Sequence, residues 1–136
     1  MQVLRSILAI VLGAVVGGAV NMGLIVMGPS VIAPPAGVDV SSSESLANAI
    51  HLFEPKHFLV PFLAHAIGTG VGALVAFVVA ATRKSLHGLI VGVLFLCGGI
   101  VSSTMIPAPI WFVAADLVLA YLPMAWLGNR LGAKFS

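Results

Sequence analysis

Five polar side chains lie inside otherwise apolar stretches of this chain, and they are the residues best placed to do chemistry. A polar group in hydrocarbon is costly unless it is paired, so such residues mark either a structural contact or a functional site. Each lies near the same predicted side of its stretch, and at a rise of about 1.5 Å per residue all fall roughly 5–10 Å from that boundary. The residues are Asn21, His65, Ser102, Ser103 and Asp116. The sequence therefore predicts one polar layer near one face of a membrane.

This polar layer has a structural and a functional interpretation. In the structural one, Asn21, His65, the serines and Asp116 form a hydrogen-bonded layer that fixes the register of the helices. Asp116 and His65 would then be a satisfied pair, as a buried carboxylate requires. In the functional one, Asp116 and His65 change protonation and bind a proton or a cation, as carboxylates do in transporters. The residue types alone leave both open.

A metal site is the third hypothesis for this region. His51 and Glu54 are spaced three apart, which can align two ligands on one helix face, and His57 follows closely. Imidazole and carboxylate groups suit zinc, iron or manganese. However, Pro55 disfavours helical geometry at Glu54, and no HExxH pattern is present. A metal ion at the outer face is therefore a weak expectation, and no other cofactor is predicted.

The composition decides the class of protein. The 136 residues are 60% apolar and 7% charged, whereas soluble domains carry roughly a quarter charged residues. This excludes a soluble enzyme and a disordered tail, and a net charge of +2 is too sparse for a nucleic-acid surface. The single cysteine, Cys97, excludes an internal disulfide and is expected to be a small buried apolar residue.

The apolar residues fall into long runs that predict an all-α, integral-membrane four-helix bundle. Each run has at least 18 residues, enough for a helix to cross a core of about 30 Å. The predicted spans are 3–27, 58–81, 87–106 and 110–127. The first continues past the small residues at Gly17–Ala19, which favours a retained span over a cleaved signal peptide. Pro123 is expected to kink the last span.

The long connection at 28–57 is the predicted outer loop, and residues 44–53 can form a short interfacial helix. A serine at 41–43 would cap that helix, and Leu46, Ile50 and Phe53 would share one of its faces. The aromatic residues of the last span, Trp111, Tyr121 and Trp126, are typical of interfacial anchors.

Charge placement predicts the orientation. Five of the six cations fall at the N-terminus, in the second loop and at the C-terminus, as Arg5, Arg83, Lys84, Arg130 and Lys134. The positive-inside rule then places both termini in the cytoplasm and the 28–57 loop outside. The predicted location is a cytoplasmic-type, inner membrane.

Small residues recur at every fourth position of the first two spans and predict close helix contacts. One stripe includes Gly13 and Gly17, and the other includes Ala64, Gly68, Gly72 and Ala76. Such stripes let backbones approach closely in lipid. They serve either a tight bundle within one chain or the seam of a homo-oligomer, and both hypotheses remain open here.

The loop and its flanks resemble a group of small bacterial four-span membrane proteins. The likeness covers nearly the whole chain and is carried by the segments at 34–39 (PPAGVD), 51–58 (HLFEPKHF), 61–65 (PFLAH), 107–112 (PAPIWF) and 116–117 (DL). The resemblance implies the architecture and carries over no activity, cofactor or site residue.

These observations favour a non-catalytic role, as an accessory, scaffold or self-associating subunit. The alternative is a small transporter or channel protomer that uses the polar layer at Asn21, His65, Ser102 and Asp116. A metal-dependent membrane enzyme is a third, weaker hypothesis. The expected partners are the lipid bilayer and a homo-oligomer or larger membrane complex, with no nucleic acid.

Overall fold

The computed structural model describes residues 1–135, and these are helical with no strand. The elements are α1 (Gln2–Val31), α2 (Ser43–Ala49), η1 (Ile50–Leu52), η2 (Pro55–Phe58), α3 (Leu59–Val79), α4 (Lys84–Met105), α5 (Ile110–Leu119) and α6 (Leu122–Phe135). Within this described range, four helical segments are long and apolar enough to cross a membrane, namely α1, η2 with α3, α4, and α5 with α6. The prediction of an all-α bundle with four membrane-length helices is confirmed at this level.

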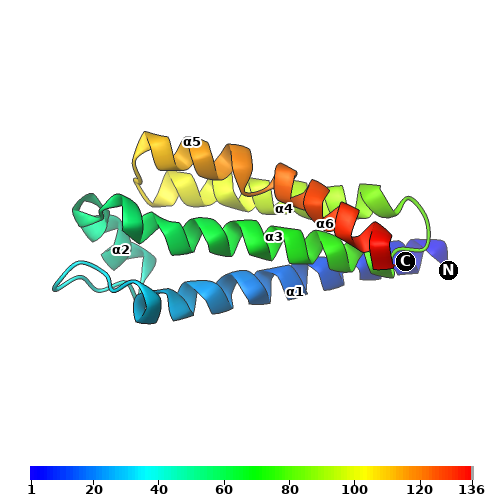
Figure 1. The fold of residues 1–136 in the computed structure, drawn as a ribbon, viewed down its shortest axis with the longest axis horizontal. Helices are drawn as coiled ribbons and strands as arrows, with labels where there is room; N and C mark the ends of the chain where they lie inside the picture. The colour runs from blue at the N-terminus through cyan, green and yellow to red at the C-terminus, as the bar shows by residue number, and fades with distance from the viewer. Residues whose placement is uncertain (136) are drawn as a thin grey trace.

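The bundle has two distinct ends (Figure 1). The N-terminus, the C-terminus and the α3–α4 turn lie at one end, which we call the terminal end. The 32–42 loop, α2 and the α4–α5 turn lie at the other, which we call the loop end. An even number of spanning segments accounts for both termini being at the same end.

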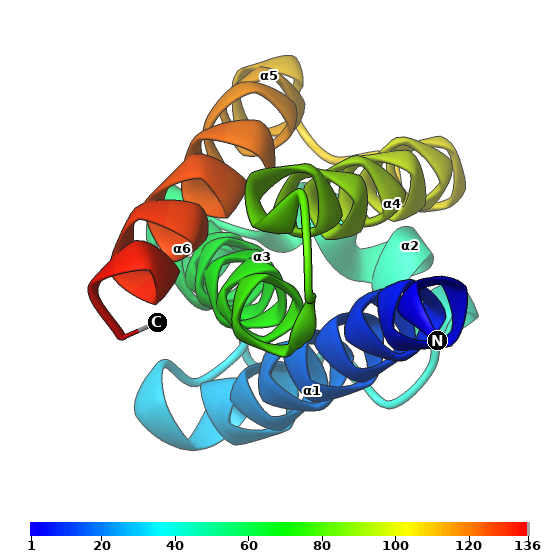
Figure 2. The same cartoon turned by 90° about the vertical axis from the view of Figure 1, so that its right-hand side faces the viewer.

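α3 is the central helix of the bundle, with α1, α4 and α6 around it (Figure 2). Its contact with α1 depends on glycine, because a Cβ added at Gly13 would lie 2.6 Å from the carbonyl oxygen of Gly72. A Cβ at Gly17 would likewise lie 2.6 Å from the carbonyl oxygen of Gly68. The two predicted stripes therefore pack against each other within one chain. This intramolecular contact accounts for the stripes without a second copy of the chain.

Ala64 and Ala76 of α3 are fully buried in the same packed centre. Cys97 of α4, by contrast, is exposed, so the expectation that it is buried is wrong. The reason is that α4 turns its glycines, such as Gly92, toward α6 and leaves the Cys97 face uncovered.

The first span and the short helix differ in their bounds from the prediction. α1 continues to Val31 and passes through Pro29, and the N–H of Ile32 still donates to the carbonyl of Gly28 at 2.8 Å. The predicted helix at 44–53 is α2 followed by the single turn η1. Ser42 caps it as expected, since its Oγ accepts from the N–H of Ser45 at 3.1 Å.

The expected span at 110–127 is built of two helices, and the expected kink near Pro123 is a break between them. α5 ends at Leu119 and α6 begins at Leu122 and runs to Phe135. Pro123 is the physical cause, because proline has no N–H to donate to Leu119 and its ring clashes with a helical carbonyl there. The break at Ala120 and Tyr121 leaves both residues buried.

Candidate functional site

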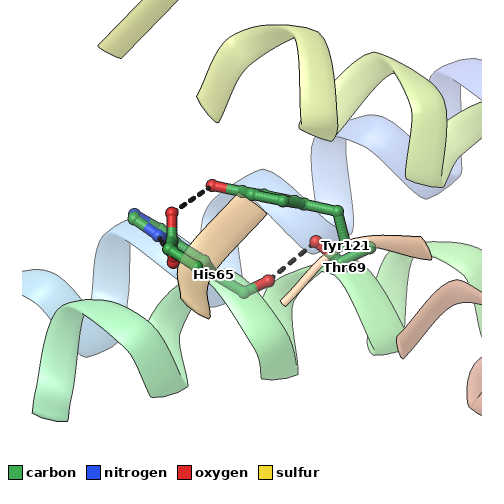
Figure 3. Close-up of polar contacts among 4 residues, drawn as sticks. His65, Thr69 and Tyr121 are labelled. Atoms are coloured by element: carbon green, nitrogen blue, oxygen red, sulfur yellow. Dashed lines mark hydrogen bonds and ion pairs between the residues drawn. The ribbon is translucent and has the colours of Figure 1, made fainter. Parts of the chain in front are cut away.

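A buried polar cluster links α3 to the break between α5 and α6 (Figure 3). Nδ1 of His65 lies 2.7 Å from Oδ1 of Asp116, and the hydroxyl of Tyr121 donates to Oδ2 of the same carboxylate at 3.2 Å. Asp116 is only 5% exposed and Tyr121 only 3%. Both carboxylate oxygens are therefore occupied, which is what a carboxyl group needs when it is removed from water.

Local structure sets the geometry of this cluster. The imidazole of His65 and the ring of Tyr121 stack with their centroids 5.8 Å apart. Thr69, one turn after His65, is fully buried and donates its hydroxyl to the His65 carbonyl at 2.7 Å. A Cβ at Gly99 of α4 would lie 2.5 Å from the Tyr121 hydroxyl, so glycine there makes room for the phenol.

A cavity of about 160 Å³ lies beside this cluster at the loop end. The side chains of Leu46, Ile50 and Phe53, from α2, η1 and the residue that follows, form part of its wall. The face that these three residues share is thus turned toward the bundle, and Ile50 is 7% exposed. The rest of the wall is mainly apolar and includes Phe58, Pro61, Phe112, Val113 and Leu117 beside His65 and Asp116.

A second hollow of about 550 Å³ adjoins the first and shares His65, Gly99 and Ser102 with it. Asn21 lies in the wall of this second hollow, and its buried Oδ1 has no hydrogen-bond partner within the described residues. Ser102 is exposed and lies in the wall of both. The two hollows form one site at the junction of α1, α3, α4 and α5.

The five residues predicted to form one layer do meet at this site, but not as one network. His65 and Asp116 are paired directly. Ser103 donates instead to the carbonyl of Ile100 in its own helix, at 2.7 Å. Asn21 and Ser102 lie in the wall of the site. Within the described residues, neither of them hydrogen-bonds to His65 or Asp116.

Tyr121 and Thr69 are site residues that sequence reasoning missed. Tyr121 was interpreted as an interfacial anchor, yet it is buried against Asp116. The available signal was its place two residues before Pro123, because a helix break at that proline allows the tyrosine to turn inward. Thr69 carried no signal beyond being a polar residue one turn after His65.

The predicted metal ligands do not converge. His57 Nδ1 accepts a hydrogen bond from the N–H of Glu54 at 2.8 Å, and Glu54 pairs with Lys56 at 3.5 Å. The bond to His57 is one half of a capping box at the start of η2, in which the Glu54 side chain accepts from the backbone N–H of His57. His51 is exposed, and in residues 1–135 no group of three His, Cys, Asp or Glu side chains is placed to hold a metal ion.

One carboxylate in the loop has a shifted pKa. The side chain and the backbone N–H of Ser41 hydrogen-bond to Asp39, and these bonds hold the pKa of its carboxyl below the usual value of 3.8. Asp39 is therefore a negative charge next in sequence to Val40 and Ser41, which lie in the wall of the larger hollow.

No protein-family model, curated protein or solved structure matches this chain.

Proposed function

We propose that this is a non-catalytic accessory protein of the membrane that binds a small, largely apolar molecule in the loop-end cavity. The observation that carries the proposal is a cavity with apolar walls beside a fully paired, buried carboxylate. Ligand pockets commonly combine mostly apolar walls with a few fixed polar groups that set orientation.

The size of the cavity supports a ring-sized occupant. Its volume of about 160 Å³ is close to that of apolar cavities of roughly 150 Å³ that stay dry and bind benzene in other proteins. Phe58 and Phe112 lie in its wall with their ring centroids 4.7 Å apart, so an aromatic occupant would meet flat partners.

The packing of the terminal half supports binding rather than passage. From residue 70 to 79 α3 contains only apolar residues and glycine. Ala73 within this stretch, and Val91 and Ala125 on the helices around it, have no exposed surface. A conduction path needs polar or wetted lining along its length. The centre of this half, around Val91 and Ala125, is close-packed with apolar side chains instead.

A matched pair of substitutions on α5 tests the proposal. Val113 lies in the cavity wall, whereas Val118 on the same helix is 65% exposed. Val113→Phe fills the cavity, and Val118→Phe adds the same bulk toward lipid. Fluorine NMR of hexafluorobenzene with protein in lipid nanodiscs measures binding, with empty nanodiscs as the baseline.

We expect a saturable shift of the hexafluorobenzene signal with wild type and with Val118→Phe. Val113→Phe should weaken binding by about tenfold or more, because a ring-sized ligand and a phenylalanine side chain cannot share this volume. A signal that follows empty nanodiscs for all three proteins would refute the proposal.

A transporter or channel protomer is the second candidate. The observation in its favour is the Asp116–His65 pair, because an ionisable pair within a span is a common element of proton pathways. The closed terminal half argues against it.

The proposal includes an orientation and a location. The loop end faces outward and both termini are cytoplasmic, because most cations belong to the terminal end. The location is an inner membrane, and a homo-oligomer or larger complex would form through the lipid-facing sides of α1 and α4, which carry many exposed large apolar side chains.

A further inference from the structure

Within the buried pair of His65 and Asp116, one polar atom remains available to a ligand. Asp116 uses one oxygen for His65 and the other for Tyr121, and it is nearly inaccessible. The side chain of His65 is 21% exposed, and only its Nδ1 is engaged by the carboxylate. The two nitrogens of an imidazole lie on different sides of the ring, so Nε2 does not face the carboxylate oxygen that Nδ1 contacts. Nε2 of His65 is therefore the group that a ligand would meet.

The charge of the pair decides what Nε2 offers. An uncompensated carboxylate inside a span costs several kcal/mol, so the pair is favoured with zero net charge. Zero charge requires two protons, whether the pair is carboxylate with imidazolium or carboxylic acid with imidazole. One proton lies between Nδ1 and Oδ1, and the other is on Nε2 in both forms. Nε2 is thus a hydrogen-bond donor, and the ligand needs an acceptor.

The wall next to His65 selects the rest of the ligand. Phe58 and Phe112 lie beside the cavity, and the ring of Trp111 meets the ring of Phe58 edge-on at 5.6 Å. A flat ring that carries a carbonyl oxygen satisfies both the aromatic wall and the donor. The larger adjoining hollow leaves room for ring substituents.

We propose that the loop-end cavity is a binding site for the ring of a lipid-soluble quinone, with one quinone carbonyl accepting a hydrogen bond from Nε2–H of His65. This inference rests on the proposed function, because it specifies the ligand of the same cavity. Aspartate acts here as a positioning residue, since it orients the imidazole and does not touch the ring.

Duroquinone, the tetramethyl benzoquinone, is the probe, because its fully substituted ring does not add to Cys97. The full chain has two tryptophans, and it is studied in nanodiscs as the Trp126→Phe variant, in which Trp111 is the remaining one. Quinones quench tryptophan fluorescence, so bound duroquinone is measured at Trp111. Durene, the same ring without carbonyls, is measured by competition.

We expect saturable quenching, with durene bound about tenfold more weakly at equal mole fraction in the lipid. His65→Leu should weaken duroquinone binding about tenfold, whereas Val118→Phe, which lies outside the cavity wall and is 65% exposed in wild type, should leave it unchanged. His65→Gln should retain most of the affinity, because its amide also donates. In isotope-edited infrared spectra, one carbonyl band of bound duroquinone should shift to lower frequency in wild type and not in His65→Leu.

Equal affinity for durene and duroquinone, or an unshifted carbonyl band in wild type, overturns the quinone assignment. Hexafluorobenzene binding then still supports the apolar cavity, so the two proposals fail separately. If His65→Leu does not fold, the wild-type infrared band and the durene comparison still decide the outcome.

Discussion

Asp116 is the residue whose surroundings are most demanding. Asp116 is 5% exposed and lies in α5, which together with α6 forms an apolar segment long enough to cross a membrane. Its two carboxylate oxygens contact His65 and Tyr121. A partner removed from such a group leaves a buried polar atom unpaired, which costs about 1–3 kcal/mol. A structural role and a transport role for Asp116 therefore predict different effects of an isosteric substitution on stability and on transport.

Asp116→Asn separates these roles. The amide oxygen can accept from His65 or from Tyr121, so we expect the free energy of unfolding to fall by no more than about 1 kcal/mol. If Asp116 carried a proton or a cation, the same change would abolish transport while folding survived. The measurements are thermal stability in detergent, and proton or cation uptake into liposomes.

Asp116→Leu is the control, because it leaves His65 Nδ1 and the Tyr121 hydroxyl without their acceptor and should be clearly less stable than the amide. We expect no flux above that of empty liposomes from wild type or from Asp116→Asn. Wild-type flux that Asp116→Asn removes would instead establish the transporter function.

At the scale of elements, the α1–α3 contact is the tightest test of the packing. A Cβ at Gly72 would lie 2.7 Å from the carbonyl oxygen of Gly13, so this position has no space for a side chain. Val78, on the same helix, is 41% exposed. The two positions therefore form a matched pair for the same substitution.

Gly72→Leu should destabilise the bundle by about 3 kcal/mol or more, because the two backbones must separate to admit the side chain. Val78→Leu should change stability by less than about 0.5 kcal/mol, as surface substitutions usually do. Unfolding in mixed micelles measures both. Equal tolerance at the two positions would mean that Gly72 faces lipid.

The helices and their contacts were predictable from the sequence, but the break in the last span was predictable only in part. Long apolar runs predict the helices, and a four-residue period of small residues predicts which face of each helix is in close contact. Both patterns can be read along a single helix. The break at Tyr121 is different. Pro123 predicts an interruption of the helix, but the inward position of Tyr121, against Gly99 and Asp116, depends on contacts between helices that the sequence pattern does not give.

The candidate site was predictable to a similar degree. His65 and Asp116 stood out because ionisable groups within spans need partners, and they are paired. That Asn21 and Ser103 join neither of them depends on helix rotation, which a pattern of small residues does not fix to within one side chain. Tyr121 was misinterpreted because an aromatic residue in a span resembles an anchor until its neighbours are known.

In the whole molecule, most basic side chains lie at the terminal end and the cavity lies at the loop end. Three basic side chains of the terminal end engage nearby groups. Arg5 donates to the carbonyl of Val79 at 2.7 Å, Lys84 lies 5.7 Å from the ring centroid of Phe77, and Arg130 lies 5.0 Å from that of Trp126. Long basic side chains behave in this way at a membrane interface, where the stem is apolar and the charge reaches water. The cavity belongs to the opposite end.

The proposed orientation rests on this division and can be tested directly. Ser42, at the start of α2, and Ser85, in the first turn of α4, are both exposed and lie at opposite ends. In a Cys97→Ala background, a cysteine at Ser42 should react with an impermeant thiol reagent added to intact cells. A cysteine at Ser85 should react only after the membrane is opened, because basic segments stay on the cytoplasmic side. The reverse pattern would place the cavity on the cytoplasmic face and would overturn the proposed orientation, while the bundle and its binding site would stand unchanged.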